Sequence, residues 1–402
     1  MSKKSIVNIS QNYYIRGGSD RYFFSLGELL EKQGHQVIPF ASNQPQNQQT
    51  IWSKYFPDGV NFDKPTIRDI MQFLYSSLAA RAINRLIADN QPQIAHLHIY
   101  YGQLTSSILS PLKQAGIPIV QTLHEYKLVC PVYTLISNGK VCQACQGRDF
   151  WQAVVKKCNR DSLSRSVLST VEAYVSGQLG AVERVDRFIT VSDFQRLKLI
   201  ELGIPKEKLT RVHNFIDTSN IVPSQKIGEY FLYFGRLERL KGIFTLVEAA
   251  AAISHVPLII LGEGNARQEL EDWIESRNLT HIKVLGAKRG KELKEFIANS
   301  ICSILPSEWY ENCPMSVLES LAYGRPVIGS EIGGIPELID DGVDGFTVPC
   351  KDWQTLKERM VYLSQHRDKA LTMGLAGRRK IDAQFSAEKH YQEILNIYQQ
   401  VS

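Results

Sequence analysis

The stretch from Ile301 to Glu337 constrains the fold more tightly than any other part of this 402-residue chain. Residues 301–305 are an apolar run typical of a buried strand, and a helix is predicted from about Met315, after a polar loop. Residues 326–330 are the next predicted strand. A strand–helix–strand unit of this kind belongs to a parallel sheet, and the N–H groups at the start of its helix attract phosphate.

Two carboxylates flank the start of this helix. Glu311 lies just before it, and Glu319 lies about 7.5 Å along it. Because each helical residue turns by about 100°, the two cannot share one helix face, and a common ligand would meet them from different sides. Pro314 suits the first helical position, where its missing N–H costs nothing.

Strands and helices alternate in two series. The first begins with the predicted strand 5–10 and includes an amphipathic helix over about 67–89. The second begins with the predicted strand 230–234, after the polar linker 217–228, and includes the unit above. A chain of 402 residues is also long enough for two cores. The sequence therefore predicts an α/β fold with two doubly wound domains.

The composition is that of a globular enzyme, with 44% hydrophobic and 22% charged residues. No apolar run approaches the roughly 18 residues that cross a bilayer, and the N-terminus enters a strand without an apolar leader. Seven cysteines in such a chain favour reduced thiols or metal ligands over disulfides. These features predict a cytoplasmic protein.

Charge is distributed unevenly along the chain. Residues 1–215 hold 25 Lys and Arg against 16 Asp and Glu, a balance of +9, and residues 216–402 have a balance of −4. A basic first half suits anionic lipid, a polyanionic substrate or nucleic acid, and an ordinary solvated surface explains it as well. Nucleic acid is the weakest of these partners, because no recognition motif accompanies the charge.

An arginine and a lysine bracket the loop after the first strand of the second series. Arg236 and Lys241 suit the two phosphates of a diphosphate, and Glu319 suits the hydroxyls of a ribose. Together with the helix start at Met315–Val317, they predict a nucleoside diphosphate ligand. The chain lacks G-x-x-x-x-G-K-[ST] and G-x-G-x-x-G, which disfavours an ATPase or a nicotinamide enzyme.

The first series has its own candidates at strand ends. Gly17 and Gly18 follow the first strand, where they either form a turn or let the backbone approach a ligand. His124 stands at the end of a later strand, and a structural and a functional role are equally supported there.

A cysteine-rich segment interrupts the first series. It holds four cysteines, of which two form a Cys-x-x-Cys pair: Cys130, Cys142, Cys145 and Cys158. Four thiols would complete a tetrahedral structural zinc site. The irregular outer spacing leaves buried thiols or a redox-labile pair as alternatives.

Several motifs, in the right order, resemble the retaining GT-B glycosyltransferases of family four (glycosyl transferases group 1). They are RGGSDRYFFSLGELLEKQGHQV at 16–37, TLHEY at 122–126, GRLERLKG at 235–242, the Glu311 and Glu319 pair, YGRPVIGS at 323–330 and GGIPELIDDGVDGF at 333–346. The resemblance covers nearly the whole chain.

This resemblance implies a GT-B architecture, with two doubly wound Rossmann-like domains facing across a cleft. Residues 1–216 would bind the acceptor and contain a Cys-rich insert at 128–160. Residues 217–385 would bind a nucleotide-sugar donor. Residues 386–402 would form a C-terminal helix that packs back on the first domain.

The resemblance also implies roles for single residues. The implied donor site consists of Arg236 and Lys241 at the diphosphate, the helix start Met315, Ser316 and Val317, Glu319 at the ribose, and Val284 at the base. The implied catalytic set adds Glu311 beside the transferred sugar and His124 at the sugar ring, with Gly17 and Gly18 at the phosphate–sugar junction. After Glu311 the chain has Asn312-Cys313-Pro314 where Gly-aromatic-Gly is usual, so Pro314 removes one backbone donor to the sugar.

The implied reaction is a retaining, front-face transfer from a UDP- or GDP-sugar to a hydroxyl of a glycan, lipid-linked or small-molecule acceptor. It serves cell-surface glycan or glycolipid synthesis and needs no catalytic cofactor. The chain has no Asp-x-Asp motif, which fits a metal-independent reaction in which Arg236 and Lys241 take the metal's role. Acceptors in this family are often embedded in the inner leaflet, so the protein is expected on the inner face of the plasma membrane. The alternatives are a catalytically silent nucleotide-sugar-binding or scaffold protein and another GT-B enzyme, such as an epimerase or a sugar-phosphate synthase.

Overall fold

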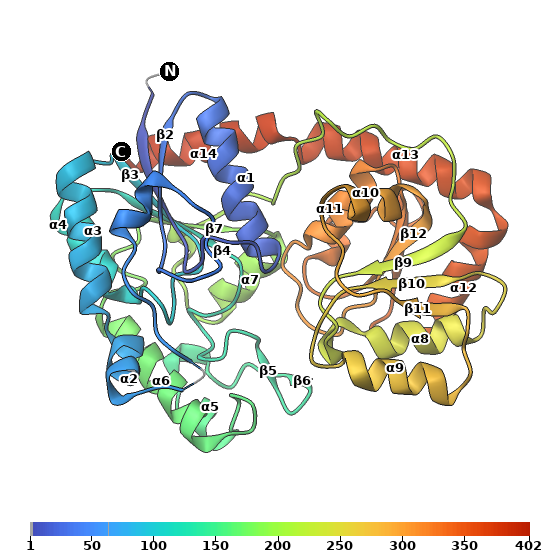
Figure 1. Ribbon diagram of the computed structural model, residues 1–402, viewed down its shortest axis with the longest axis horizontal. Coiled ribbons are helices and arrows are strands. Elements are labelled where there is room, and N and C mark those ends of the chain that lie inside the picture. The colour runs from blue at the N-terminus through green and yellow to red at the C-terminus, as the bar shows by residue number, and fades with distance from the viewer. Residues whose placement is uncertain (1–2, 63) are drawn as a thin grey trace. The chain divides into compact units, whose positions relative to one another are not determined.

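Six parallel strands form the main sheet of each of the two units into which the chain divides (Figure 1). The computed structural model describes residues 3–62 and 64–402. Unit 1 consists of Met1–Val212 and Tyr391–Ser402, and unit 2 consists of His213–His390. The predicted α/β fold with two doubly wound sheets is confirmed.

The sheet of unit 1 is built from short apolar strands. They are β1 (Ser5–Ile9), β2 (Gln36–Phe40), β3 (Ile94–Leu97), β4 (Ile119–Leu123), β7 (Arg187–Thr190) and β8 (Leu209–Arg211). Their order in the sheet is β2-β1-β3-β4-β7-β8. Ile6, Val7 and Ile9 of β1 have no exposed surface, as expected for a parallel strand that is covered on both faces. The two-residue strands β5 (Ile136–Ser137) and β6 (Lys140–Val141) form a separate hairpin in the Cys-rich segment.

Helices cover both faces of this sheet. They are α1 (Gly18–Lys32), α2 (Ile67–Leu74), α3 (Ser77–Asn90), α4 (Leu109–Gln114), α5 (Gln152–Val155), α6 (Leu163–Gln178) and α7 (Asp193–Glu201). The helices α3 and α4 pack on each other on one side of the strands, and α1 lies on the other side (Figure 1).

The single helix expected over residues 67–89 is wrong, because α2 and α3 are separate helices. Tyr75 is extended between them, and Ser76 caps α3 by accepting a hydrogen bond from the N–H of Ala79 at 3.1 Å. A serine cap can restart a helix within a stretch whose apolar periodicity continues.

Unit 2 also has a six-stranded parallel sheet, and its first strand has two strands on one side where β1 of unit 1 has one. Its strands are β9 (Tyr230–Phe234), β10 (Leu258–Leu261), β11 (Ile282–Val284), β12 (Ser300–Leu305), β13 (Val327–Ser330) and β14 (Gly345–Val348). They are ordered β11-β10-β9-β12-β13-β14. Every residue of β12 is buried at the middle of the sheet, which confirms the strand predicted at 301–305.

The helices of unit 2 alternate with its strands. They are α8 (Ile243–Ala251), α9 (Arg267–Ser276), α10 (Gly290–Ala298), α11 (Met315–Ala322), α12 (Trp353–Gln365) and α13 (Arg367–Gln384), and the start of α14 (Ala387–Val401) follows. In Figure 1, α8 and α9 lie on one side of the strands, and α10 and α11 lie on the other.

The direction in which successive strands are added reverses once in each sheet. In unit 2 the reversal lies between β9 and β12, and in unit 1 it lies between β1 and β3. Loops that leave neighbouring strands at such a reversal run to opposite faces, so they open a crevice at the carboxyl ends of the strands. The loops at these two places are therefore the expected ligand sites.

The end of the chain belongs to unit 1. Tyr391 and Tyr398, both on α14, place their hydroxyls 3.0 Å from His35 Nε2 and 2.6 Å from His96 Nδ1. The units divide at 212/213 and 390/391, and the expected boundaries at 216/217 and 385/386 stay predictions. Within the described part of the chain, no helix is long and apolar enough to cross a membrane.

Candidate functional site

The loops at the reversal point of unit 2 bring one lysine and one glutamate together. Lys241 Nζ lies 2.5 Å from Glu311 Oε1, and the two side chains are only 13% and 9% exposed. Lys241 ends a short 3-10 turn (Arg239–Lys241) between β9 and α8, and Glu311 lies in the loop between β12 and α11. The pair therefore joins the two loops that define the crevice.

Two glycines allow these loops to approach. Gly242 has a φ of +68°, and a Cβ there would lie 1.7 Å from the carbonyl oxygen of Pro306. Gly333 has a φ of +64°, and a Cβ there would lie 2.3 Å from the carbonyl oxygen of Glu311. The N–H of Gly334 donates to that same oxygen at 2.7 Å. Only glycine fits positions 242 and 333, so the backbone fixes where the ion pair forms.

The surroundings of Glu311 keep it ionised. Burial alone would raise the pKa of Glu311, but the Lys241 ammonium and the Ser307 hydroxyl, 3.0 Å from Oε1, outweigh burial and lower that pKa. Lys241 Nζ also lies 4.9 Å from the centroid of the Trp309 ring, in a cation–π contact. The carboxylate and the indole together hold one positive charge at the ends of the strands.

Arg236 lies on the same loop but does not join this pair. Its guanidinium is 54% exposed, and its Nη1 lies 2.8 Å from Glu238 Oε1. The Tyr233 hydroxyl donates to its carbonyl oxygen at 2.7 Å. The two cations expected at the diphosphate thus have separate carboxylate partners. An exposed ion pair such as Arg236–Glu238 is weak, so a phosphate can displace the glutamate.

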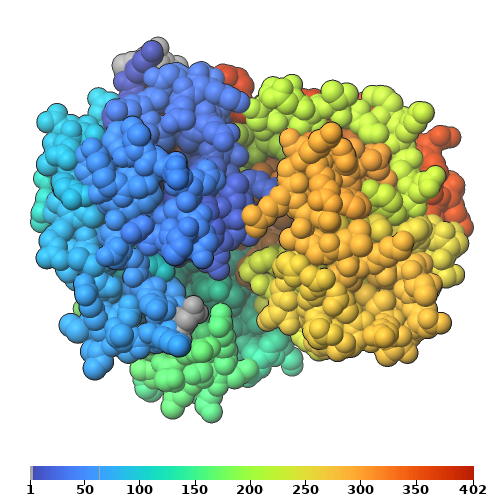
Figure 2. All heavy atoms as spheres, in the orientation of Figure 1, coloured from blue at the N-terminus to red at the C-terminus, as the bar shows by residue number. Residues whose placement is uncertain are grey.

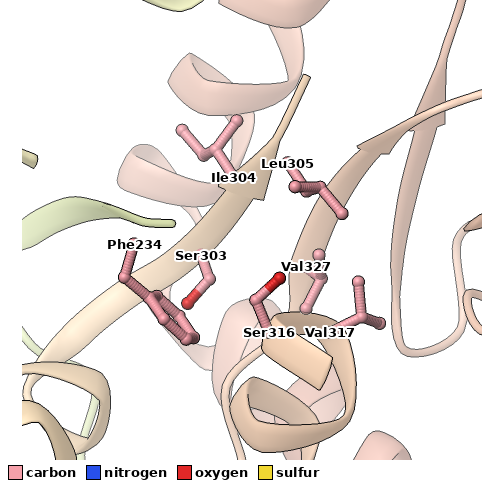
Figure 3. A pocket seen from close by; sticks show the side chains of 7 residues that line it. All are labelled: Phe234, Ser303, Ile304, Leu305, Ser316, Val317 and Val327. Carbon is pink, nitrogen blue, oxygen red and sulfur yellow. The ribbon is translucent and has the colours of Figure 1, made fainter. Parts of the chain in front are cut away.

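A small pocket lies between β9, β12 and the start of α11 (Figure 3). It is lined by Phe234, Ser303, Ile304, Leu305, Ser316, Val317 and Val327. The hydroxyl of Ser303 is buried and has no hydrogen-bond partner among the described residues. Ser316 and Val317 of the expected phosphate-binding helix start line this pocket, and Met315 is half-buried just before them.

Three other predicted positions lie near the same elements. Pro314 is the N-cap of α11, one residue before the helical position that was expected, and its φ is −66°. Glu319 is half-buried on α11, next to the buried Leu318. Val284 is half-buried at the end of the edge strand β11. The structure therefore places these residues on unit 2.

Gly17 and Gly18 start the first helix of unit 1. Gly17 is the N-cap of α1, and Asp20 holds the turn by accepting hydrogen bonds from the N–H groups of Arg16 at 2.9 Å and Gly17 at 3.1 Å. The φ of Gly17 is −158°, which any residue adopts. A Cβ at this position would meet no described atom within 4 Å. Neither the backbone nor the packing of the described residues requires a glycine at position 17.

His124 follows β4 and lies against a second histidine. His98 Nδ1 is 3.2 Å from His124 Nε2, and the two rings are nearly parallel at 19°. His98 Nε2 is 2.8 Å from Asn8 Oδ1, while the Asn8 amide nitrogen donates to the carbonyl of Phe23. This hydrogen-bond network assigns the His98 proton to Nε2, so His98 Nδ1 accepts and His124 carries its proton on Nε2.

Burial keeps both of these rings neutral. It lowers the pKa of His124 to about 3. It also lowers the pKa of His98 well below its ordinary value, and His96 and His124 add to that effect. The ring of Tyr22 packs 5.1 Å from that of His124. A neutral imidazole can exchange a hydrogen bond with a hydroxyl group, but it offers no charge to a phosphate.

The histidine stack has a third member that the sequence reasoning missed. The His96 ring lies 4.7 Å from that of His98 at an angle of 4°, and its Nε2 is 2.8 Å from Thr122 Oγ1. His96 and His98 are two positions apart on β3, so they share one face of the sheet. Two histidines at alternate positions of one strand, beside a strand that ends just before His124, were the sequence signal that could have revealed this cluster.

The four cysteines of the insert are free thiols, with Cys130 buried and the others half-buried. Burial, followed by the charges that Cys130, Cys158 and Cys142 would carry, raises the pKa of the Cys145 thiol to about 12. The four thiols are therefore close enough to influence one another, and Cys145 is protonated at neutral pH. Over residues 3–62 and 64–402, no three or more His, Cys, Asp or Glu side chains are arranged to hold a metal ion. The zinc site stays a prediction.

Known proteins match both halves of the chain. The family model described as Glycosyltransferase Family 4 matches residues 16–220, and the one described as Glycosyl transferases group 1 matches residues 216–380. The amylovoran biosynthesis glycosyltransferase AmsK of Erwinia amylovora is 28% identical over 228 residues. The match spans 53% of this chain and 56% of AmsK.

Solved structures share the fold over almost the whole chain. A sucrose-phosphate synthase from Thermosynechococcus elongatus has a TM-score of 0.72 at 19% identity, and 99% of each chain is covered. Anabaena HepE, solved in complex with UDP-glucose, has a TM-score of 0.69 at 16% identity. That match covers 99% of this chain and 100% of the HepE chain. At these identities the likeness shows a shared fold.

Proposed function

Because this chain belongs to glycosyltransferase family four, within the group 1 glycosyltransferases, we propose that it transfers a sugar from a nucleotide-diphosphate sugar to an acceptor hydroxyl. The family expected from the motifs is confirmed. The proposed reaction retains the anomeric configuration and needs no metal, and its products are a glycoside and a nucleoside diphosphate.

The observation that carries this proposal is the buried ion pair of Lys241 and Glu311 at the reversal point of unit 2. A departing nucleoside diphosphate gains negative charge, so a cation held in place before the reaction stabilises the transition state. Lys241 supplies such a cation. Arg236 is exposed five positions away, and it supplies the second cation when its guanidinium turns from Glu238 to a phosphate oxygen.

The remaining donor contacts are assigned to unit 2. The start of α11, at Met315, Ser316 and Val317, offers backbone N–H groups to a phosphate. Glu319 accepts hydrogen bonds from the ribose, and Val284 borders the base. The HepE complex with UDP-glucose supports a uridine nucleotide, and a guanosine nucleotide is the alternative.

The transferred sugar and the acceptor are assigned to residues of unit 1. His124 is neutral, so it orients a sugar hydroxyl through a hydrogen bond without repelling or attracting charge. Gly17 has no packing reason to be glycine, which supports close approach of the donor to the backbone at Gly17 and Gly18.

The protonation state of Glu311 bears on the mechanism. A carboxylate that is bonded to Lys241 and has a lowered pKa is a poor base and a poor nucleophile. A two-step reaction through a glycosyl-enzyme would need that nucleophile. In front-face transfer the acceptor oxygen bonds to the sugar on the side that the diphosphate leaves, and a diphosphate oxygen takes the proton. Glu311 then positions Lys241.

The acceptor is a glycan, a lipid-linked sugar or a small molecule. The relative named for amylovoran biosynthesis supports a role in glycan synthesis. A cytoplasmic location, contact with the anionic inner face of the plasma membrane and a structural zinc at Cys130, Cys142, Cys145 and Cys158 belong to the same proposal. Burial and three neighbouring thiols raise the pKa of Cys145, and four thiols in one neighbourhood are a suitable set for zinc.

The test is a screen of UDP- and GDP-sugars for slow hydrolysis without acceptor, measured as nucleotide release. We expect release from one donor, and we expect Lys241→Ala to suppress it. Binding of a donor, measured by calorimetry, without release under any condition would instead identify a silent binding protein. Release of nucleotide together with an isomerised free sugar would identify an epimerase.

A further inference from the structure

Helix α6 of unit 1 has its polar side inward and its apolar side outward. Its buried residues are small or polar, namely Ser166, Ser169, Thr170, Glu172, Ala173 and Ser176. Its apolar residues Leu163, Val167, Val171 and Tyr174 are 39–55% exposed. At about 100° per residue these four lie within an arc of about 80°, so they form one continuous stripe.

Specific contacts hold α6 in this orientation. Glu172 forms a buried ion pair with Lys127 at 2.5 Å. The Ser169 hydroxyl accepts a hydrogen bond from the Asn159 amide at 2.7 Å. The Ser176 hydroxyl forms a hydrogen bond with the hydroxyl of Ser106, which is also buried. Rotating the helix to bury its apolar stripe would break all three contacts and strand the Glu172 charge, so the stripe stays outside.

Two neighbouring helices extend this stripe. Helix α2 contacts α6 and has no buried residue. Its Ile67 and Met71 are 79% and 66% exposed. Beside α5, the N–H of Trp151 donates to the Tyr174 hydroxyl at 3.3 Å, and the Trp151 ring is largely exposed. Figure 2 shows the blue segment that contains α2 beside the green segment that contains α5 and α6. The apolar face consists of Ile67, Ile70, Met71, Trp151, Val155, Leu163, Val167, Val171 and Tyr174.

Basic side chains accompany the apolar face. Arg68, Lys156, Lys157, Arg160 and Arg165 are all exposed, and none forms an ion pair with a described residue. Apart from the buried Glu172, the acidic residues in the same segments are Asp69, Asp149 and Asp161, so five positive charges face three negative ones. Three of the basic residues directly follow or interrupt the apolar ones in sequence: Arg68 follows Ile67, Lys156 follows Val155, and Arg165 lies between Leu163 and Val167.

We infer that the apolar face docks unit 1 on an anionic lipid bilayer. Isoleucine, methionine and valine enter the acyl boundary, tryptophan and tyrosine suit the interface, and lysine and arginine bind anionic headgroups. The five exposed basic side chains give this face an excess of positive charge, which complements the negative surface of an anionic bilayer. The docking itself is independent of the transfer reaction. Its consequence, that the acceptor is lipid-linked, rests on the proposed function.

The test is co-sedimentation of the full chain with vesicles. Vesicles of phosphatidylcholine with about one third phosphatidylglycerol should capture the protein at low salt, and pure phosphatidylcholine vesicles should capture little. Removing apolar contacts by Ile67→Asn with Met71→Asn should weaken capture tenfold or more. Removing two charges by Lys156→Gln with Lys157→Gln should weaken capture about fivefold per charge at low salt, and the difference should vanish near molar salt.

Matched substitutions elsewhere control for general effects. Leu197→Asn changes an apolar residue on α7 that is 57% exposed, and Lys291→Gln changes an exposed lysine on unit 2. Both should leave capture unchanged. All variants should keep the wild-type melting temperature and donor hydrolysis without vesicles, so loss of docking and loss of transfer are measured separately.

Two results would overturn this inference. One is equal capture of the wild type and the Ile67→Asn, Met71→Asn variant. The other is a wild type that is dimeric by sedimentation velocity and a variant that is monomeric, because the apolar face would then bind a second copy of the chain.

Discussion

Unit 1 and unit 2 place their first helix in the same topological position, after the first strand of a parallel sheet, but with different chemistry around it. In unit 2 the N-cap Gly242 is left-handed and packed against a carbonyl, and Lys241 before it is locked to Glu311. In unit 1 the N-cap Gly17 is extended and open, and the nearby strand ends carry neutral histidines. One scaffold thus provides a charged site and an uncharged site.

This contrast shows how little of a doubly wound unit decides its ligand. The strands supply a crevice in both units, and a few loop residues decide whether it presents charge. In the proposed reaction, the diphosphate is therefore assigned to unit 2 and the sugar hydroxyl groups to unit 1. Four measurements would break or sharpen this comparison.

The largest effect is expected when the cation of unit 2 is removed. Lys241→Ala should lower donor turnover about 100-fold, on the order of 3 kcal/mol of transition-state stabilisation. Because it also leaves Glu311 buried and unpaired, the variant should melt earlier, and Lys241→Ala with Glu311→Gln should recover stability without activity. Arg239→Ala, on the same turn but paired with Glu269, is the control. Normal turnover of Lys241→Ala would remove the phosphate assignment.

Substituting the two N-cap glycines by alanine should have very different effects on the free energy of unfolding. Gly242→Ala adds a Cβ at a φ of +68° and 1.7 Å from the Pro306 oxygen, so it should destabilise unit 2 by about 2–3 kcal/mol. Gly17→Ala meets no described atom within 4 Å and should change the free energy of unfolding by less than about 0.5 kcal/mol. Urea unfolding measures both. Equal losses of unfolding free energy in the two variants would mean that the turns at Gly17 and Gly242 do not differ in their need for glycine.

Acid should weaken unit 1 before unit 2. The pKa of buried His98 is lowered, so its contribution to stability is complete above the unfolded value near 6.5 and is lost as pH falls below it. His124, whose pKa is lowered to about 3, has the same dependence and loses on the order of 2 kcal/mol between pH 7 and pH 5. The pKa of Glu311 is lowered too, so its contribution is complete above the unfolded value near 4.5 and is lost progressively as pH falls below it, at a more acidic pH than for His98.

Hydrogen exchange at pH 5 and pH 7, corrected for intrinsic rates, can separate the units. Amides of β3 and β4 should lose more protection at pH 5 than amides of β9 and β12. The pKa of His390 in unit 2 is lowered to about 3, so acid also destabilises unit 2 through this residue. The expected difference between the units is therefore in the size of the loss of protection. Greater loss in β9 and β12 would reverse the comparison.

The smallest effect is expected from a chelator. Because Lys241 and Arg236 are proposed to supply the cations, donor turnover should be unchanged after treatment with a chelator. Elemental analysis decides the separate question of the insert in unit 1, where the zinc alternative requires about one zinc per chain, lost with Cys145→Ser. A folded, zinc-free protein would leave the buried-thiol alternative. A turnover that falls on chelation and returns with a divalent metal would contradict the assignment of the cations to side chains.

Apolar runs predicted much of this fold from the sequence. The strands at 301–305 and 230–234 were located because both faces of a parallel strand are covered, which leaves a continuous apolar stretch. The break between α2 and α3 was not located, because Ser76 interrupts the helix without interrupting its periodicity.

The site was less predictable than the fold. Lys241 and Glu311 were each identified as candidates, but their ion pair joins two loops that are 70 positions apart and depends on the left-handed Gly242 and Gly333. Local sequence patterns carry no information on such a distant meeting. The outward apolar side of α6 was equally hidden, because helical periodicity predicts an apolar stripe but not which way the stripe faces.

The bond between Tyr398 and His96 has a consequence for how the protein is made. After Val212 is added, a ribosome adds 190 further residues before it reaches Ser402, which takes roughly 10–40 s at typical bacterial and eukaryotic rates. During this interval the nascent unit 1 lacks its closing segment, Tyr391–Ser402, whereas unit 2 is continuous and can finish folding as soon as it emerges. The half of the protein that is synthesised first is therefore the half that is completed last.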